Sequence, residues 1–548
     1  MSDGSFDVII VGAGSAGCVL ASRLSADPAR RVLLLEAGPR DRSPWIHAPG
    51  GYYRLMYHPV LSWNFAAGPE PGLDGRTMVW PGGRVLGGSS AINGMVYIRG
   101  QPWDFDGWRD MGCAGWGWAD VLPCFRRAED QARGADAFHG TGGPLPVSDI
   151  SEHHELSDAF IAAAMQWGLP RNDDFNGATQ EGAGTYQLTA RGRRRGSTAA
   201  TYLRAARGRA NLTVLTGARA TGVLLEGQRA TGVRVHHAGA ERIFHAAETI
   251  VAAGAMRSPH LLMLSGIGPA AALRAAGVPV LHDLPGVGRN LQDHLQVKLA
   301  CRVAGVETIN EIRRSAWRMA REGLRFLLAA RGPLANSTLM AGGFVRTDPA
   351  LDRPDVQLHF QPLSGPSSGV FHDFAGCTLT VSQMHPQSRG AVWLRSANPA
   401  EPPGMRANYL VAEADQRVVV AALRLGREIL SQPALRRFRP EEVAPGTAAA
   451  DDVALLAHAR ATGFTQFHQV GSCRMGTDED AVVDAGLRVR GLDGLRVADT
   501  SVMPTLVSGN TNAAAVMIGE RAAELIIGVA ACRCAGPAGA SDCPATRQ

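Results

Sequence analysis

The sequence predicts an α/β fold: a mostly parallel sheet with a β-meander, joined to a second α+β domain on a mainly antiparallel sheet. Two strand–turn–helix units, at 6–24 and 248–265, are typical of buried parallel strands. Short strands separated by turn residues at 213–235 predict the meander. From 301 to 463, strand-like runs alternate with loops and helices, as expected for an antiparallel sheet flanked by helices.

The turn of the first unit carries Gly12, Gly14 and Gly17 in the spacing G-x-G-x-x-G. Such glycines allow a tight turn, the approach of a pyrophosphate to the backbone, and close packing of helix on strand. The helix that follows offers free N–H groups and a positive dipole end to phosphates. Glu36 ends the next strand, where a carboxylate accepts hydrogen bonds from ribose hydroxyls. The unit predicts a Rossmann-like dinucleotide site; Glu36 disfavours NADP but does not separate NAD from FAD.

Bulk composition excludes several function classes. A chain of 548 residues with a formal net charge of +5 can bury a large core and form two or more domains. Its one basic run, Arg191 to Arg195, has no interleaved aromatic residues, so we expect a solvated or substrate-side loop and no nucleic-acid binding. The nine cysteines form no C-x-x-C pair, which indicates free thiols in a reducing compartment and no metal site.

We expect the sequence to contain neither a signal peptide nor a membrane-spanning helix, and the expected cellular location depends on both. The first strand begins almost at the N-terminus, which leaves no room for a signal peptide. The sequence also has no apolar run of about 18 residues, the minimum for a membrane-spanning helix. We expect a cytoplasmic protein, and peripheral association with the inner face of the cytoplasmic membrane stays open.

A second glycine-rich segment lies at 84–100. Its two glycine pairs precede Ser89 and Ser90, a pattern typical of a turn that presents backbone N–H groups ahead of a serine-capped helix. An ordinary glycine-rich loop explains the spacing equally well. In the second unit, Ser258 and Pro259 predict the cap and first position of its helix.

Four segments of the chain together resemble the glucose–methanol–choline (GMC) family of flavin oxidoreductases. They are Gly12 to Gly17 with Glu36, Arg84 to Gly100, Gly254 to Gly268, and His468 to Gly476 with Asn510. Two match the family pattern closely, namely Gly87-Gly88-Ser89-Ser90 with Asn93, and Gly254-Ala255 through Ser265-Gly266-Ile267-Gly268. The resemblance covers roughly Phe6 to Ile527 and is nearest in pattern to bacterial alcohol dehydrogenases and choline dehydrogenase.

The resemblance implies a bound FAD. By motif match, the ADP half would be held by Gly12, Gly14, Gly17 and Glu36, with the backbone near Ala220 at the adenine. The pyrophosphate and flavin would be lined by Arg84, Val85, Gly88, Ser89, Asn93, Gly94 and Val96. The isoalloxazine would be closed by Ala498, Asp499, Asn510 and Thr511. Some family members attach FAD to a histidine in the segment that matches 87–94; because the corresponding place here, near Ile92, is apolar, we predict non-covalent FAD.

The change in sequence pattern from about residue 301 divides the chain into domains. We expect 1–300 and 464–530 to form the FAD-binding domain, with substrate-side insertions around 40–80 and 100–200. We expect 301–463 to form the substrate-binding domain and 531–548 to be a disordered tail.

The chemistry points to His468 as a catalytic base. An alcohol hydroxyl is too weak an acid to ionise unaided near neutral pH, and a neutral imidazole is the best-matched base there. By motif match His468 would face flavin N5 beside Asn510. An asparagine cannot take the proton, so Asn510 would orient the hydroxyl and stabilise a developing alkoxide through its NH₂ group.

We therefore predict an FAD-dependent GMC-type alcohol dehydrogenase. It would oxidise a primary alcohol to an aldehyde by base-assisted hydride transfer to flavin N5 and pass electrons to a quinone-like acceptor. Choline dehydrogenase is an alternative, because the aromatic residues of 45–63 could bind a trimethylammonium group. An alcohol oxidase using oxygen, a flavin-binding module without turnover and an NAD enzyme are further alternatives.

Overall fold

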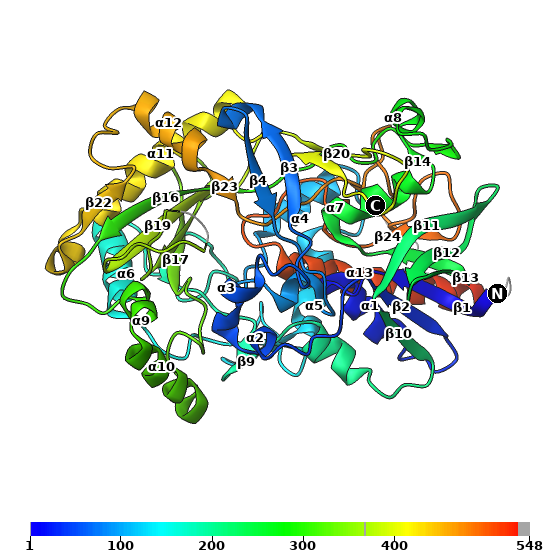
Figure 1. Cartoon of the computed structure of the whole chain (residues 1–548), viewed down its shortest axis with the longest axis horizontal. Helices are drawn as coiled ribbons and strands as arrows, with labels where there is room; N and C mark the ends of the chain where they lie inside the picture. Colours follow the sequence, from blue (N-terminus) through cyan, green and yellow to red (C-terminus); the bar gives the residue numbers. More distant parts are fainter. Residues whose placement is uncertain (1, 367–368, 535–548) are drawn as a thin grey trace.

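The computed structural model describes residues 2–366 and 369–534, which form two large sheets (Figure 1). The first sheet lies near the N-terminus at one end of the molecule, and the second lies at the other end, with helix α13 between them in the view of Figure 1. Among the described residues, no helix is both long enough and apolar enough to cross a membrane.

The first sheet confirms the predicted parallel strands and meander. Its parallel strands, in spatial order, are β10 (Leu212–Thr216), β2 (Val32–Glu36), β1 (Ser2–Val11), β13 (Ala240–Val251) and β24 (Leu495–Val497). The meander adds β12 (Arg229–His237) and β11 (Ala218–Glu226), which pair antiparallel to β13. In the centre, Ile9 lies beside Leu33 and Thr249, and all three side chains are buried. An apolar run without alternation therefore gives a strand covered on both faces.

Helices α1 (Ser15–Leu24) and α13 (Asn512–Cys534) pack together beside this sheet. A Cβ added to Gly519 would lie 2.9 Å from Val19 Cβ, so α13 approaches α1 through a glycine. The Ser15 hydroxyl donates to Asn512 Oδ1 at 2.7 Å and joins the two helix starts. Helix α13 ends at Cys534, so it extends into the predicted tail. The rest of that tail, 535–548, lies outside the described residues.

The second sheet is antiparallel, as predicted. Its strands, in spatial order, are β22 (Glu441–Ala444), β16 (Leu295–Arg302), β19 (Gly376–Gln383), β18 (Val356–Gln361), β17 (Ala341–Val345) and β7 (Gly182–Thr185), with β23 (Phe464–Thr465) beside β16. Strand β16 begins before the expected boundary at 301, and β7 comes from the 100–200 insertion. The second sheet thus draws strands from outside 301–463.

One face of the second sheet is apolar and carries helices α6 (Glu155–Trp167) and α11 (Glu413–Leu430). Phe160 of α6 stacks on Phe360 of β18 with 4.6 Å between ring centroids. A Cβ added to Gly426 of α11 would lie 2.6 Å from Leu299 Cδ1 of β16. Because side chains alternate along a strand, the polar residues between these positions lie on the other face.

Two predicted helix starts are wrong. Helix α7 (Gly254–Leu264) begins at Gly254, so Ser258 does not cap it and Pro259 lies inside it. After the glycine pairs of 84–100 there is only a 3₁₀ turn, Gly88–Ala91, where a serine-capped helix was predicted. In both places the helical turn begins at a glycine that precedes the serine predicted to cap it.

The remaining elements are short or peripheral. The helices are α2 (Pro44–His47), α3 (Tyr52–Leu55), α4 (Pro102–Asp110), α5 (Trp118–Ala128), α8 (Ala270–Ala275), α9 (Ile309–Arg314) and α12 (Asp452–Thr462). The two-stranded sheets pair β3 (Phe65–Glu70) with β4 (Arg76–Trp80), β5 (Glu129–Gln131) with β6 (Leu145–Val147), β8 (Ala190–Arg191) with β9 (Arg194–Arg195), β14 (Ile267–Gly268) with β15 (His282–Asp283), and β20 (Ala391–Trp393) with β21 (Gly404–Arg406).

Helix α10 (Ala316–Ala329) has its apolar side chains toward solvent and projects from the body of the molecule (Figure 1). Trp317 is 75% exposed and Leu328 is 79% exposed, and Leu324 and Leu327 are exposed beside them. The one buried side chain of the helix is Glu322, which forms ion pairs with neighbouring arginines. This orientation is the reverse of an ordinary surface helix, which buries its apolar stripe.

Candidate active site

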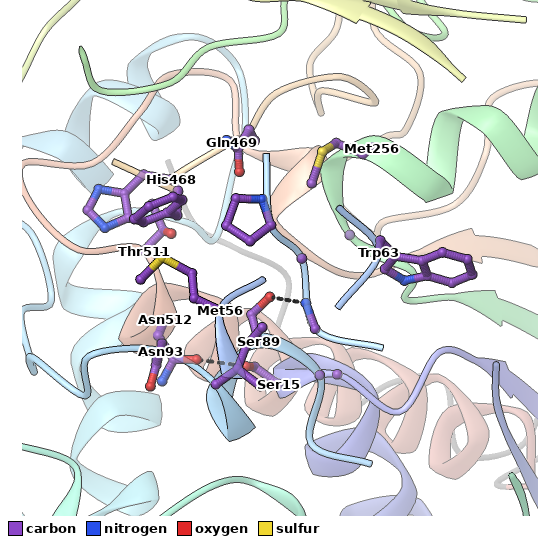
Figure 2. Close-up of a pocket in the computed structure, with 18 of the residues that line it drawn as sticks. Ser15, Met56, Trp63, Ser89, Asn93, Met256, His468, Gln469, Thr511 and Asn512 are labelled. Carbon is purple, nitrogen blue, oxygen red and sulfur yellow. Dashed lines mark hydrogen bonds between the residues drawn. The ribbon is translucent and has the colours of Figure 1, made fainter. Parts of the chain in front are cut away.

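A cavity of about 390 Å³ extends from the carboxyl ends of β1 and β2 to the polar face of the second sheet. Figure 2 shows residues from distant parts of the chain around it: Ser15 and Ser89 lie on one side, His468 and Thr511 on another, and Trp63 on a third. Both large sheets contribute to the wall, so the cavity is a site built between the two predicted domains.

Most of the predicted site residues line this cavity. They are Gly12, Gly14, Glu36, Gly88, Ser89, Asn93, Gly94, Val96, Ala220, His468, Asp499, Asn510 and Thr511. Four predicted residues are not among those that line it: Gly17, Arg84, Val85 and Ala498. Among these four, Ala498 donates its N–H to the Val251 carbonyl at 2.9 Å, and the Arg84 guanidinium lies 4.8 Å from the centre of the Trp63 ring.

Glycines leave the backbone open at the end near β1. Gly12 has a φ of 105°, and a Cβ added there would lie 2.5 Å from the Ala252 carbonyl oxygen. A Cβ added to Gly88 would lie 2.7 Å from Gly14 Cα, whereas the nearest atom to a Cβ on Gly14 is 4.0 Å away. Two glycine-rich turns therefore meet with no side chain between them, which fits the approach of a pyrophosphate to backbone N–H groups.

Glu36 is fixed at the end of β2 by backbone donors. Its carboxylate accepts from the Ala13 N–H at 3.0 Å and from the Gly38 N–H at 2.8 Å. Burial raises the pKa of Glu36 to about 7, against the lowering effect of these hydrogen bonds. Each carboxylate oxygen can accept a second hydrogen bond, so the group fits a ribose at this end of the cavity.

Asp499 and Asn93 are held by partners that the sequence did not indicate. Asp499 Oδ2 accepts from the Gly254 N–H at 2.8 Å and from the Ser258 hydroxyl at 2.6 Å, so it fixes the start of α7. Asn93 Oδ1 accepts from Arg195 Nη1 at 2.8 Å. Arg195 is buried, although it ends the basic run that we expected to form a solvated or substrate-side loop.

His468 lies in a chain of side-chain hydrogen bonds that joins both domains. Its Nδ1 is 2.9 Å from His294 Nδ1, and its Nε2 is 3.1 Å from Asn510 Nδ2. At the ends of the chain, His294 Nε2 lies 3.0 Å from the Met384 carbonyl, and Gln357 Nε2 donates to Asn510 Oδ1 at 3.2 Å. All of these side chains except Asn510 are buried.

The direction of these hydrogen bonds assigns the proton of His468. A carbonyl only accepts, so His294 Nε2 carries its proton and His294 Nδ1 is an acceptor. His468 Nδ1 must then donate to it, which leaves the lone pair of His468 Nε2 to accept from Asn510 Nδ2. Burial lowers the pKa of His294 to about 3 and holds the pKa of His468 well below its usual value, so both rings are neutral. His468 Nε2 is therefore an unprotonated base at the cavity.

Asp293 fixes the backbone that carries this base. Its Oδ1 accepts from the His468 N–H at 2.8 Å, and its Oδ2 accepts from the Tyr409 hydroxyl at 2.5 Å. The preceding residue, Phe467, has a φ of 66°, a left-handed conformation that costs roughly 1–2 kcal/mol for an ordinary residue. The buried carboxylate thus holds a strained turn that directs His468 into the cavity.

Sequence reasoning missed Asp293 and His294. Both lie in the stretch before β16 that has only turn signals, and His294 is 174 residues from His468. Two polar residues directly before a strand are a weak signal, because the same pattern occurs at many strand starts. The described residues contain no group of three His, Cys, Asp or Glu side chains arranged to hold a metal ion.

The buried state of His468 predicts a pH dependence. Because its pKa in the folded protein lies well below 6.5, the unfolded chain binds this proton more tightly, and its contribution to stability falls as the pH drops below about 6.5. The base itself stays deprotonated through that range. We expect the acid limb of kcat/KM for an alcohol to lie below pH 6.5, measured with steady-state kinetics between about pH 5 and 8. An acid limb centred above pH 6.5 would contradict the assignment.

Comparisons with known proteins agree with this geometry. The N-terminal and C-terminal models of the GMC oxidoreductase family match residues 6–296 and 386–519. The chain is 43% identical to alcohol dehydrogenase [acceptor] of Pseudomonas putida over 95% of its length and 96% of the relative. It is 41% identical to mitochondrial choline dehydrogenase of Homo sapiens, over 95% of this chain and 90% of the relative.

A solved structure gives the same result. Pyridoxine 4-oxidase from Mesorbium loti superposes with a TM-score of 0.86 at 34% identity, covering 95% of this chain and 98% of that one. The family models match well over half of the chain, and they include the glycine turns, His468 and Asn510. The chain therefore belongs to the GMC oxidoreductase family.

Proposed function

We propose that this protein oxidises a primary alcohol to an aldehyde with non-covalently bound FAD and passes the electrons to a quinone-like acceptor. The observation that carries the proposal is the unprotonated Nε2 of His468 at the cavity beside the Asn510 amide. The relatives named alcohol dehydrogenase [acceptor] and choline dehydrogenase support an alcohol substrate and a separate electron acceptor.

In the proposed reaction His468 removes a proton and Asn510 binds the substrate oxygen. When bound, the flavin of FAD supplies the hydride acceptor. His468 Nε2 takes the hydroxyl proton of the alcohol, which lets the C–H bond of the same carbon release its hydride and leaves an aldehyde. In the structure Asn510 Nδ2 donates one hydrogen to His468 Nε2. The alcohol hydroxyl would take the place of that N–H at His468 Nε2, and Asn510 Nδ2 can then donate to the substrate oxygen, where negative charge develops.

The residues around the cavity fit FAD. Open glycine backbone at Gly14, which Gly88 approaches closely, suits the pyrophosphate, and Glu36 suits the ribose. Side-chain atoms of Gln466 and His359 in the wall are buried without a partner among the described residues, which is typical of a site whose ligand completes the hydrogen bonding.

The mode of attachment gives a direct test. Because Ile92 occupies the place where some family members carry a histidine that attaches FAD, we expect acid precipitation to release a yellow flavin into the supernatant. Flavin that stays with the pellet would contradict non-covalent binding.

The function itself is tested by anaerobic bleaching of the flavin. We expect a panel of primary alcohols to bleach the oxidised absorbance, with stoichiometric aldehyde. We expect a quinone analogue to restore the absorbance faster than dissolved oxygen does. If no alcohol bleaches the flavin, the proposal fails; if oxygen restores it as fast as the quinone, the protein is an oxidase.

Choline is the second candidate substrate. Aromatic side chains line the cavity, among them Tyr52, Tyr53, Tyr57 and Trp63, and such rings bind trimethylammonium groups. Against this, the ammonium of Lys298 lines the same cavity and would repel a cation. We therefore favour an uncharged or anionic alcohol over choline, and choline belongs in the same bleaching panel.

We further propose that helix α10 docks on an anionic lipid surface, where quinones are dissolved. Its exposed face combines Trp317 with leucines, and Arg314 and Arg331 near its ends have no ion-pair partner among the described residues. An apolar face with tryptophan and flanking arginines is typical of helices that lie in a membrane interface. Helix α9 beside it places Arg313 3.9 Å from the centre of the Phe371 ring, which lines the cavity.

Sedimentation with vesicles tests this surface. We expect the protein to pellet with vesicles that contain phosphatidylglycerol, less with phosphatidylcholine alone, and much less after Leu328→Glu. The control Val453→Glu introduces the same charge at a valine that is 78% exposed on α12. Equal binding of both variants, or no binding by the unmodified protein, would contradict the proposed docking.

A further inference from the structure

Lys298 is the only lysine in the chain, and it lies in the cavity wall. It belongs to β16, where it pairs with Thr380 of β19, which pairs in turn with His359 of β18. All three residues line the cavity. The neighbours Val297 and Leu299 are buried on the opposite face of the strand, so the Lys298 side chain extends from the cavity face of the sheet.

The Lys298 ammonium has no partner. Its backbone carbonyl accepts from His458 Nε2 at 3.0 Å, yet its side chain forms no hydrogen bond or ion pair with any residue that the structure describes. Burial alone lowers the pKa of Lys298, with no carboxylate acting against it. A structural role would not require an ammonium here, since an isolated charge in a protein wall costs free energy until it is paired.

No carboxylate on this side of the cavity can pair with Lys298. Among the described lining residues, the carboxylates are Glu36 and Asp499. Glu36 is bound to backbone N–H groups at the end of β2, and Asp499 is bound to Gly254 and Ser258 at the start of α7. The substrate-side wall on the second sheet is otherwise made of neutral groups such as Thr380 and Gln296.

The sheet register places Lys298 away from the reacting carbon. Gln357, which donates to Asn510, lies in the cross-strand row that contains Gln296. Lys298 lies in the next row and two strands away, about 7 Å along the strands and about 10 Å across them. A group bound by Lys298 would therefore be several bonds from the hydroxyl that reaches His468.

We propose that Lys298 binds an anionic group of the substrate, so that the preferred alcohols are medium-length molecules with a carboxylate at the end opposite the hydroxyl. This inference rests on the alcohol oxidation proposed above and specifies its substrate class. The carboxylate would supply the missing partner of the ammonium through a charge-assisted hydrogen bond in a wall that is shielded from water. A quaternary ammonium in the same position would meet repulsion.

The experiment uses the holoenzyme and matched substrates. For a series of ω-hydroxy acids of increasing length, we expect kcat/KM to exceed that of the matching methyl esters, with an optimum at an intermediate length. Lys298→Met, which keeps the length of the side chain, should lower the ratio of acid to ester by about 10- to 100-fold. Arg302→Met removes a positive charge from an exposed position on the same strand and should leave that ratio unchanged.

Equilibrium binding gives an independent measurement. An unbranched carboxylic acid without a hydroxyl should bind and perturb the flavin absorbance. Lys298→Met should weaken the binding of this acid, relative to that of the matching amide, by the same factor, about 10- to 100-fold. Equal kcat/KM for acids and esters in the unmodified protein, or an equal loss in Lys298→Met and Arg302→Met, would overturn the inference. If neither acids nor esters bleach the flavin, alcohol oxidation itself fails, which is a distinct outcome.

Discussion

Replacing His468 by alanine is expected to slow flavin reduction by an alcohol by up to about 10⁴-fold, the upper end of the range for general acid–base catalysis. FAD should remain bound, because the side chain of His468 contacts His294 and Asn510 and not the glycine turns that suit the pyrophosphate. Stopped-flow mixing of the oxidised enzyme with alcohol under anaerobic conditions measures the rate directly.

Two controls sharpen this result. Asn510→Ala removes one donor and leaves the base, so a smaller loss of about 10²-fold is expected. Added imidazole should restore part of the rate in His468→Ala, since it can enter the space that the side chain leaves. Near-normal reduction by His468→Ala without imidazole would show that another group takes the proton.

Replacing Gly17 by alanine is expected to abolish cofactor binding. A Cβ at this position would lie 1.9 Å from the Gly12 carbonyl oxygen and 3.0 Å from the Gly12 carbonyl carbon. Both atoms belong to the backbone, so no side chain can move aside and α1 must shift away from the turn that carries Gly14. The purified variant should be colourless and should melt at a lower temperature than the unmodified holoenzyme.

Gly107→Ala is the matched control. Gly107 lies in helix α4, and no atom is within 4 Å of a Cβ added there. Because alanine is favoured over glycine in a helix by up to about 1 kcal/mol, this variant should keep its flavin and melt no lower than the unmodified protein. A yellow Gly17→Ala protein with an unchanged melting temperature would show that close packing on Gly12 is not required.

The spacing of apolar residues predicted many of the strands and helices, because an element that is buried on one or both faces has apolar residues at regular positions. The strand of the predicted unit at 6–24 and the next strand, which ends at Glu36, form adjacent parallel strands. The start of α7 could not be read in this way. Ser258 has the character of a cap, yet its hydroxyl donates to Asp499, a contact that joins residues 241 positions apart.

His468, the proposed catalytic base, and Asn510 were chosen from their motifs, whereas His294 and Gln357 were not. His294 and Gln357 come from strands of the second sheet or the turn before them, and only the assembled sheet places them next to His468 and Asn510. The proposed role of Lys298 also depends on the assembled sheet, because it rests on the lack of a carboxylate beside this residue among the described residues of the cavity wall. The order of residues around Lys298 does not show which side chains of β19 and β18 will lie beside it, so it cannot show that none of them is a carboxylate.

The hydrogen bond between Ser15 and Asn512 has a consequence for biosynthesis. These residues are 497 positions apart, so at about 5–20 residues per second a ribosome needs roughly 25–100 s to make the second after the first. Throughout that interval the glycine turn at residues 12–17 is exposed without the helix and the base that complete its site. Loading of FAD must therefore be one of the last events in the maturation of the chain, and a nascent chain held before residue 468 should not acquire the absorbance of the finished flavoprotein.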